Sequence, residues 1–301
     1  MQSPDVVALF GPTGLGKTAV AIELADLLRE RGEDPVAVSV DSMQVYREIP
    51  IVTGAPTADE RLRLEHRLVG HVSVADRYDV ATHAKLAHAE IDALRAERRR
   101  PFVVGGTGLY LRAALTELDL LPPPRTGVRE RLIGELEQDG QEAMYARLQE
   151  EAPDVAAQLQ PGDSRRTLRA LEALDQGESQ ASRDENRLWT SETRVPTRLF
   201  ALVMDREELY ARIHTRVDEM VAGGARSEAL GAREIAGKTA RQALGFQELL
   251  EDDVDALKTN TRRYAKRQLT WLRKLGGAEI IDVTGRSAGD VAADIAARIT
   301  D

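Results

Sequence analysis

A phosphate-loop pattern stands near the start of the chain. Residues 10–20 read FGPTGLGKTAV and fit G-x-x-x-x-G-K-[ST], with Gly11, Gly16, Lys17 and Thr18 in the required places. In this pattern backbone N–H groups surround phosphate oxygens, the Lys adds positive charge, and the Thr hydroxyl reaches a magnesium ion. We predict a diphosphate site made of Gly11, Pro12, Thr13, Gly14, Leu15, Gly16, Lys17 and Thr18, with Thr18 as the Mg²⁺ ligand. The pattern alone does not choose between ATP, GTP and another diphosphate.

A carboxylate follows the next apolar run. Asp41 comes directly after residues 36–40, VAVSV, which indicate a buried strand. At the end of a strand Asp41 could bind magnesium or act as a general base, a role that typically contributes ~10²- to 10⁴-fold to a rate. The alternative is an Asp that caps a turn or helix.

An arginine stands at the edge of an apolar helix face. In residues 205–221, DREELYARIHTRVDEMV, apolar side chains recur at Leu209, Ile213, Val217 and Met220. At about 100° per residue, Arg216 falls beside this face. A guanidinium turned inward is costly without an anion. Two partners remain open, a core carboxylate such as Asp41 or a bound diphosphate, and a planar guanidinium suits the second.

Two further stretches have a pattern that favours ligand contact. Residues 104–110, VGGTGLY, follow a strand, and their glycines indicate either a tight turn or a close neighbour. Residues 260–274 form a helical pattern whose basic side chains share one arc, with no acidic residue among them. The basic side chains are Arg262, Arg263, Lys266, Arg267, Arg273 and Lys274. Contact with nucleic-acid phosphates and a solvated charged face are both open.

These residues need a scaffold, and the apolar runs predict a parallel α/β sheet of the P-loop type flanked by helices. Strands are expected at 6–10, 36–40, 102–104, 199–203 and 280–283, with a helix over 18–30. Because ligands bind at the carboxyl ends of parallel strands, the phosphate loop, Asp41 and the 104–110 loop should meet there.

The strand pattern is interrupted in the middle of the chain. Residues 1–115 and 196–301 are predicted to form the two parts of the α/β core, and residues 116–195 an all-helical insertion. LPPPRTG (121–127) and a polar stretch (175–196) should be its two flexible connections.

The composition of the chain excludes several classes of protein. The chain has 301 residues, a net charge of −9 and no cysteine, which excludes disulfides and thiolate metal sites. It shows no signal-peptide pattern and no apolar run of membrane-spanning length, so we expect a cytoplasmic protein with no membrane partner.

Together these stretches resemble the tRNA dimethylallyltransferases, also called tRNA isopentenyltransferases, of the bacterial type that lacks a zinc-finger extension. The matching motifs are GPTGLGKT, DSMQVYR, VGGTGLY, DSRRTLRALE, LYARIHTRVDEM and TRRYAKRQLTW, in the family's order. The resemblance implies transfer of a dimethylallyl group from dimethylallyl diphosphate to N6 of adenosine 37 in tRNA. The phosphate loop would then hold a diphosphate that leaves as pyrophosphate.

The resemblance also implies roles for residues and partners. Asp41 would accept the N6 proton, with Thr107 and Arg216 as further catalytic residues and Mg²⁺ as cofactor. The tRNA anticodon stem-loop would contact Asp41, Ser42, Met43, Gln44, Thr107, Arg129, Arg165, Arg166, Arg169, Arg262, Arg263, Lys266 and Arg267. A monomer is expected, and the insertion should hold the anticodon arm.

Some positions depart from the family pattern. IVTGAP (51–56) stands where I-G-T-A-K-P is usual, HRLVG (66–70) where H-H-L-I-D is usual, and GFQE replaces a G-Y-R segment. A Lys, a His and an Asp are thus missing near Ala55, Arg67 and Gly70. Three alternatives stay open: a prenyltransferase of free adenine nucleotides, a small-molecule P-loop kinase, and a tRNA-binding protein without catalysis.

Overall fold

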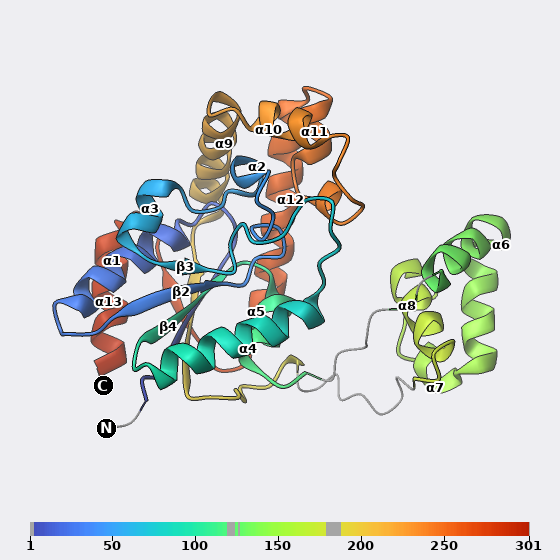
Figure 1. Cartoon of the computed structure of the whole chain (residues 1–301), viewed down its shortest axis with the longest axis horizontal. Helices are drawn as coiled ribbons and strands as arrows, with labels where there is room; N and C mark the ends of the chain where they lie inside the picture. Colours follow the sequence, from blue (N-terminus) through green and yellow to red (C-terminus); the bar gives the residue numbers. More distant parts are fainter. Residues whose placement is uncertain (1–2, 119–123, 126, 179–187, 301) are drawn as a thin grey trace. The chain divides into compact units, whose positions relative to one another are not determined.

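A six-stranded parallel sheet forms the centre of the core (Figure 1). The computed structural model describes residues 3–118, 124–125, 127–178 and 188–300. The strands are β1 (Val6–Phe10), β2 (Pro35–Ser39), β3 (His66–Arg67), β4 (Arg100–Gly105), β5 (Thr197–Val203) and β6 (Ala278–Asp282). Their order is β3-β2-β4-β1-β5-β6. All neighbouring strands pair in parallel, so the predicted fold class is confirmed.

The five predicted strands lie at the apolar runs that predicted them, but the sequence did not predict β3. Strand β3 has only two residues, which pair with Ala37 and Val38 of β2. Such a short edge strand leaves no period-two pattern in the sequence. Strand β1 lies between β4 and β5 and is fully buried, as expected for a sheet covered on both faces.

Helices cover both faces of the sheet. On one face Val7 and Leu9 of β1 belong to a core that includes α1 (Lys17–Arg29) and α13 (Ala288–Thr300). On the other face Val6 and Ala8 pack in a core with α4 (Val80–Ala96) and α5 (Gly108–Leu115). Two short helices, α2 (Pro50–Thr53) and α3 (Ala58–Arg63), follow β2.

The chain between β5 and β6 is helical, as the sequence predicts. It contains α9 (Arg206–Ala222), α10 (Ala225–Ala232), the 3₁₀ turn Ala240–Gln242, α11 (Phe246–Leu250) and α12 (Val254–Leu272). Helix α12 begins six residues before the predicted start at 260, because Asp253 caps it and accepts a hydrogen bond from the Ala256 amide at 2.8 Å.

The chain divides into two compact units. One comprises Met1–Leu118 with Arg187–Asp301, and the other comprises Asp119–Asn186. The second unit has its own apolar core, built from α6 (Val128–Glu151), α7 (Pro153–Ala156) and α8 (Ser164–Leu174). We predicted wider limits for the insertion, 116–195. Residues 121–123, 126 and 179–187 of its two predicted connections lie outside the described residues.

Candidate active site

The phosphate loop connects β1 to α1. Gly14 and Gly16 adopt left-handed conformations, with φ of 88° and 76°, so glycine suits both places. A Cβ on Gly14 would lie 3.0 Å from Cγ1 of Ile213, because α9 packs against the loop. The amides of Gly14, Leu15 and Gly16 donate to no acceptor in the described part of the chain. Together with the N-terminus of α1, these amides form a site suited to an anion.

Lys17 points back over the loop. Its Nζ donates to the carbonyl oxygens of Gly11 and Pro12, each at 2.9 Å. Burial and the charge of Arg216 together lower the pKa of Lys17 to about 8, and Asp41 opposes the shift. The amine therefore lies among carbonyl dipoles, with another cation nearby. An anionic ligand would stabilise its charged form.

A cavity of about 910 Å³ opens at the carboxyl edge of the sheet. Its walls come from the phosphate loop and the start of α1, from the ends of β2 and β4, and from helices α2, α3, α9 and α12. The predicted site residues that line it are Thr13, Gly14, Gly16, Lys17, Thr18, Asp41, Ser42, Met43, Gln44, Arg216 and Arg267. Gly11, Pro12 and Leu15 also belong to the loop, but they are buried and do not line the cavity. The structure thus brings the phosphate loop and Asp41 to one cavity.

Asp41 combines a structural contact with a free oxygen. Its Oδ1 accepts hydrogen bonds from the amides of Met43, at 2.9 Å, and Gln44, at 3.4 Å. This is the turn-capping role that the sequence left open. Its Oδ2 accepts no hydrogen bond from the described residues. One oxygen therefore fixes the turn, and the other remains able to accept a proton from a ligand.

Arg216 has no anionic partner in the described part of the chain, since no carboxylate lies within 4.0 Å of its guanidinium. Arg212, one turn earlier on α9, pairs with Glu208 at 2.8 Å. Burial lowers the pKa of Arg216, while the carboxylates of Asp41, Glu60 and Glu219 oppose the shift. Of the two partners left open by the sequence, an ion pair with Asp41 does not form. The guanidinium faces the cavity, where an anionic ligand could pair with it.

The glycines of the 104–110 loop make room for helix α12. A Cβ on Gly106 would lie 2.3 Å from Nε2 of Gln268, and one on Gly108 would lie 2.3 Å from Cε3 of Trp271. Of the two readings of these glycines, close approach of a neighbour therefore applies at Gly106 and Gly108. The hydroxyl of Thr107 lies 3.3 Å from that of Tyr264, which lines the cavity.

Gln268 was not predicted as a site residue. Its Oε1 accepts a hydrogen bond from the Thr13 amide at 3.0 Å, and its Nε2 donates to the Gly106 carbonyl at 2.8 Å. This buried amide joins the phosphate loop to the 104–110 loop. It shares the buried stripe of α12 with Thr261, Ala265 and Leu272, so a polar residue within that stripe was the signal.

The basic arc of α12 is mostly exposed. Arg263, Lys266, Arg267 and Arg273 face solvent, and none pairs with a carboxylate in the described ranges. Arg262 is half-buried, with its guanidinium 5.6 Å from the ring centre of Tyr210. Exposed cations without carboxylate partners can bind phosphates without breaking an existing ion pair.

The predicted tRNA-binding arginines of the insertion fall into two groups. Arg129 and Arg169 pair with Glu172 at 2.6 and 2.9 Å, and this carboxylate is fully buried. The pair with Arg129 joins α6 to α8, whereas the pair with Arg169 lies within α8. Arg165 and Arg166 are exposed on α8, and Arg166 lies 3.7 Å from Asp163. Tests on tRNA contact should therefore begin with the exposed pair.

Two departures from the family pattern have local structural consequences. Gly70 adopts φ of 62°, a conformation that an Asp would enter at a cost. Arg67 pairs with Glu65 at 2.9 Å and with Glu90 at 2.6 Å. Ala55, where the family has a Lys, lines the cavity, which therefore has one cation fewer.

The described residues contain no group of three or more His, Cys, Asp and Glu side chains placed to hold a metal. A magnesium ion here would need ligands from the substrate and water, which is usual for Mg²⁺ bound beside phosphates. Thr18 lines the cavity, and its hydroxyl is the kind of ligand that fits that arrangement. In the same described ranges no helix has the length and apolar character needed to cross a membrane.

Comparison with known proteins gives one consistent family. Residues 44–275 match the family described as IPP transferase. The tRNA dimethylallyltransferase of Natranaerobius thermophilus is 33% identical over 307 residues, covering 97% of this chain and 90% of that protein. The enzyme of the same name from Azorhizobium caulinodans is 39% identical over 285 residues, covering 90% and 89%.

Solved structures agree. The full-length tRNA isopentenylpyrophosphate transferase of Bacillus halodurans superposes with a TM-score of 0.70 and 32% identity, covering 98% of this chain and 95% of that one. A eukaryotic dimethylallyltransferase acting on tRNA gives a TM-score of 0.75 and 27% identity, covering 98% and 78%. These matches argue against the kinase alternative. The chain belongs to the tRNA dimethylallyltransferase family.

Proposed function

We propose that this enzyme transfers a dimethylallyl group from dimethylallyl diphosphate to N6 of adenosine 37 in tRNA and releases pyrophosphate. The observation that carries the proposal is the cavity of about 910 Å³. It combines a phosphate loop with Arg216 and with Oδ2 of Asp41, neither of which has a partner among the described residues. Cations on one wall suit a diphosphate, and a carboxylate on another suits an amine that must lose a proton.

The donor would bind through its diphosphate. The free amides of the phosphate loop, Lys17 and Arg216 are placed to contact phosphate oxygens. Lys17 would give up its bonds to the carbonyls of Gly11 and Pro12 to reach them. The hydroxyl of Thr18 would hold Mg²⁺, which would neutralise part of the diphosphate charge.

Transfer needs an acceptor close to the allylic carbon. The N6 nitrogen forms a bond to that carbon as the carbon–oxygen bond to the diphosphate breaks, and the diphosphate leaves with the bonding electrons. Positive charge at Lys17 and Arg216 stabilises the charge that develops on the leaving group. The proton on N6 passes to Oδ2 of Asp41, which the turn leaves free.

The acceptor base must leave its stack to enter the cavity, at a cost of roughly a few kcal/mol. We propose that contacts with the anticodon stem-loop offset this cost, through the exposed cations of α12 and through Arg165 and Arg166. We also propose that the enzyme acts as a monomer. Because its substrate is tRNA, we place the enzyme in the cytoplasm.

Label transfer from dimethylallyl diphosphate tests the proposal. The protein and Mg²⁺ are incubated with labelled donor and an anticodon stem-loop that carries adenosine 37 between two further adenosines, with AMP as a parallel acceptor. We expect label on the stem-loop alone. Label on AMP would instead favour the nucleotide-prenylating alternative, and label on neither would favour a binder without catalysis.

A further inference from the structure

Strands β1 and β4 end side by side, at Phe10 and Gly105, which form the last pair of their parallel ladder. Beyond this pair the chain continues into the phosphate loop on one side and into the 104–110 loop on the other. No backbone hydrogen bond in the described part of the chain joins residues 11–13 to residues 106–108. The spacing of the two loops therefore depends on side-chain contacts.

The side-chain amide of Gln268 supplies such a contact. Its Oε1 accepts the Thr13 N–H at 3.0 Å, and its Nε2 donates to the Gly106 carbonyl at 2.8 Å. The two partners fix which end of the amide is the oxygen, because a backbone N–H only donates and a carbonyl only accepts. The amide of Gln268 thus takes the place of a peptide group between the two strands, just past the end of their ladder. We call this pair of hydrogen bonds the Gln268 bridge.

Space for the Gln268 bridge comes from Gly106. A Cβ on Gly106 would lie 2.3 Å from Nε2 of Gln268 and 2.9 Å from the Gly11 carbonyl oxygen, so a methyl group does not fit there. Gln268 is only 4% exposed. The loss of either hydrogen bond would therefore leave a buried polar group without a partner, which favours one fixed geometry.

Each end of the bridge lies next to a group that is proposed to act on a substrate. Thr13 precedes Gly14, whose amide is among those suited to the diphosphate. Gly106 precedes Thr107, whose hydroxyl lies 3.3 Å from that of Tyr264 in the cavity wall. Gln268 itself lies on α12, the helix whose exposed cations are proposed to contact the anticodon stem-loop. One side chain thus joins the donor loop, the Thr107 loop and the proposed tRNA-binding helix.

We propose that Gln268 is a positioning residue that sets the distance between the donor diphosphate and the acceptor base. The inference rests on the proposed function, in which the phosphate loop holds the donor and Thr107 contacts the acceptor. Without the bridge each loop keeps its other contacts, such as those of Lys17 with Gly11 and Pro12. Each substrate should then still bind, whereas the alignment of the two should be lost. A misplacement of ~1 Å lowers a rate by up to ~10²-fold.

Gln268→Met tests the bridge, because it nearly keeps the side-chain volume and removes both hydrogen bonds. We expect the single-turnover rate of label transfer, with donor and stem-loop both saturating, to fall by ~10- to 100-fold. The affinities for pyrophosphate with Mg²⁺ and for the stem-loop should each change by less than about threefold. A general loss of stability would instead lower the amount of active protein and leave this rate unchanged.

Gln268→Asn is a second variant, which stays neutral and polar. Its amide is one methylene shorter, so it reaches only one of the two loops, and the saturated rate should again fall. This variant decides the question if Gln268→Met does not fold. Hydrogen exchange at the Thr13 amide gives a readout independent of activity, because this amide should exchange faster once Gln268→Met has removed its acceptor. Unchanged exchange in a folded Gln268→Met protein would contradict the bridge.

Thr116→Val is the matched control. Thr116 is also buried, and its hydroxyl donates to the Arg112 carbonyl at 2.6 Å, at the end of α5. This change removes a buried hydrogen bond in the same unit but touches neither loop. We expect a comparable loss of thermal stability, with a single-turnover rate within about twofold of the unaltered protein. Equal rates in Gln268→Met and Thr116→Val would overturn the proposal.

The proposed function and the Gln268 bridge fail in different ways. If the unaltered protein transfers no label to the stem-loop, the proposed function is wrong and the inference falls with it. If the unaltered protein is active and the Gln268 variants transfer label at the same saturated rate, only the role of Gln268 is wrong. If Gln268→Met binds pyrophosphate more than about tenfold more weakly at an unchanged saturated rate, Gln268 serves donor binding alone, which also contradicts a role in alignment.

Discussion

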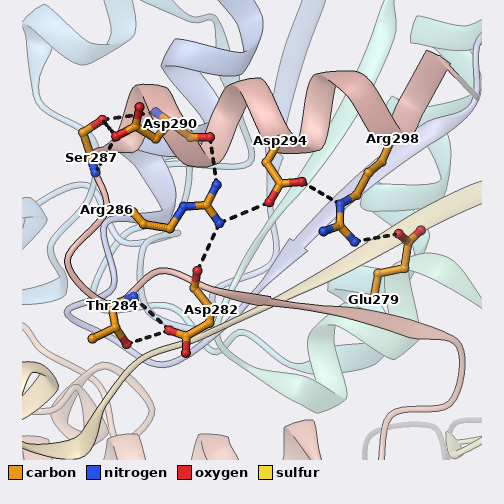
Figure 2. A network of polar contacts seen from close by, with 8 residues as sticks. All are labelled: Glu279, Asp282, Thr284, Arg286, Ser287, Asp290, Asp294 and Arg298. Carbon is orange, nitrogen blue, oxygen red and sulfur yellow. Dashed lines mark hydrogen bonds and ion pairs between the residues drawn. The ribbon is translucent and has the colours of Figure 1, made fainter.

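The arginines at the C-terminal helix pair with carboxylates, whereas Lys17 and Arg216 in the cavity have no carboxylate partner among the described residues. On β6, on α13 and in the loop between them, eight residues form a polar network, which we call the α13 network. Its members are Glu279, Asp282, Thr284, Arg286, Ser287, Asp290, Asp294 and Arg298 (Figure 2). Arg286 contacts Asp294 at 3.1 Å, and Asp294 accepts a hydrogen bond from Arg298 at 2.8 Å. Each arginine of the network has a carboxylate partner.

In the cavity, by contrast, Lys17 and Arg216 pair with no carboxylate in the described part of the chain. Burial lowers the pKa of both side chains, and the charge of Arg216 also lowers the pKa of Lys17. A protein keeps such an arrangement at a cost in stability. Paired charges thus stabilise an element of the fold, whereas charges without a partner in a cavity indicate the site of an anionic ligand.

The largest expected effect is on Asp41. Asp41→Asn keeps an oxygen that can accept the amides of Met43 and Gln44, but it removes the base. We expect kcat to fall by ~10²- to 10⁴-fold while affinity for the stem-loop stays nearly unchanged. Single-turnover label transfer at saturating donor measures this change.

Glu219→Gln is the control for this variant. Glu219 also lines the cavity and is exposed, so its neutralisation removes a nearby carboxylate without removing the proposed base. It should change kcat by less than about twofold. Near-normal turnover of Asp41→Asn would exclude Asp41 as the base.

The next effect concerns the exposed cations of α12. The double charge reversal Arg263→Glu with Lys266→Glu should weaken stem-loop binding by at least about tenfold. It should also flatten the dependence of affinity on salt, because fewer counterions are released. Titrations at several salt concentrations measure both quantities.

A second double reversal, Arg29→Glu with Arg298→Glu, changes the net charge equally but alters residues that already have partners. Its salt dependence should match that of the unaltered protein. If both double variants change the slope equally, net charge alone governs binding, and the contrast between paired and unpaired cations fails.

A pH effect should follow from Lys17. Burial lowers its pKa to about 8, so the free enzyme loses this positive charge as the pH rises through that value. Diphosphate binding needs the protonated amine, so kcat/KM for the donor should fall above pH 8, approaching tenfold per pH unit. Rates measured from neutral to alkaline pH give the profile. Lys17→Arg should remove the fall, since guanidinium does not titrate there; a fall that persists in this variant would have another origin.

The sequence predicts features that depend on local pattern. The phosphate loop, Asp41 after β2 and the inward edge of α9 were all visible from residue type and spacing, and the structure brings them to one cavity. Features that depend on partners distant in sequence were not visible. The hydrogen bonds of Gln268 join segments more than 160 residues apart.

Two predicted tRNA contacts show the same limit. Arg129 and Arg169 carry the charge that suits a phosphate, but the structure pairs both with the buried Glu172. Sequence pattern gives a residue's charge and helix face, but not the through-space partner that already uses the charge. Their contact with tRNA stays a prediction.

The smallest expected effect is in the α13 network. Arg286→Ala should lower the free energy of unfolding by less than about 1 kcal/mol, because ion pairs at a protein surface contribute little. The loss should shrink further at about 1 M salt, where charges are screened. Urea unfolding at low and high salt measures it, and label transfer should remain unchanged.

The same network gives a stability effect of known sign. The hydrogen bond from Arg298 holds the pKa of Asp294 below its usual 3.8, and Arg286 adds to this shift. The stabilisation is therefore present above pH 3.8 and is lost as the pH falls through the lowered pKa. Asp294→Asn should reduce the loss of stability on acidification. If Arg286→Ala instead impaired prenyl transfer at full stability, paired charges would serve the reaction as well, and the division between fastening and binding charges would be wrong.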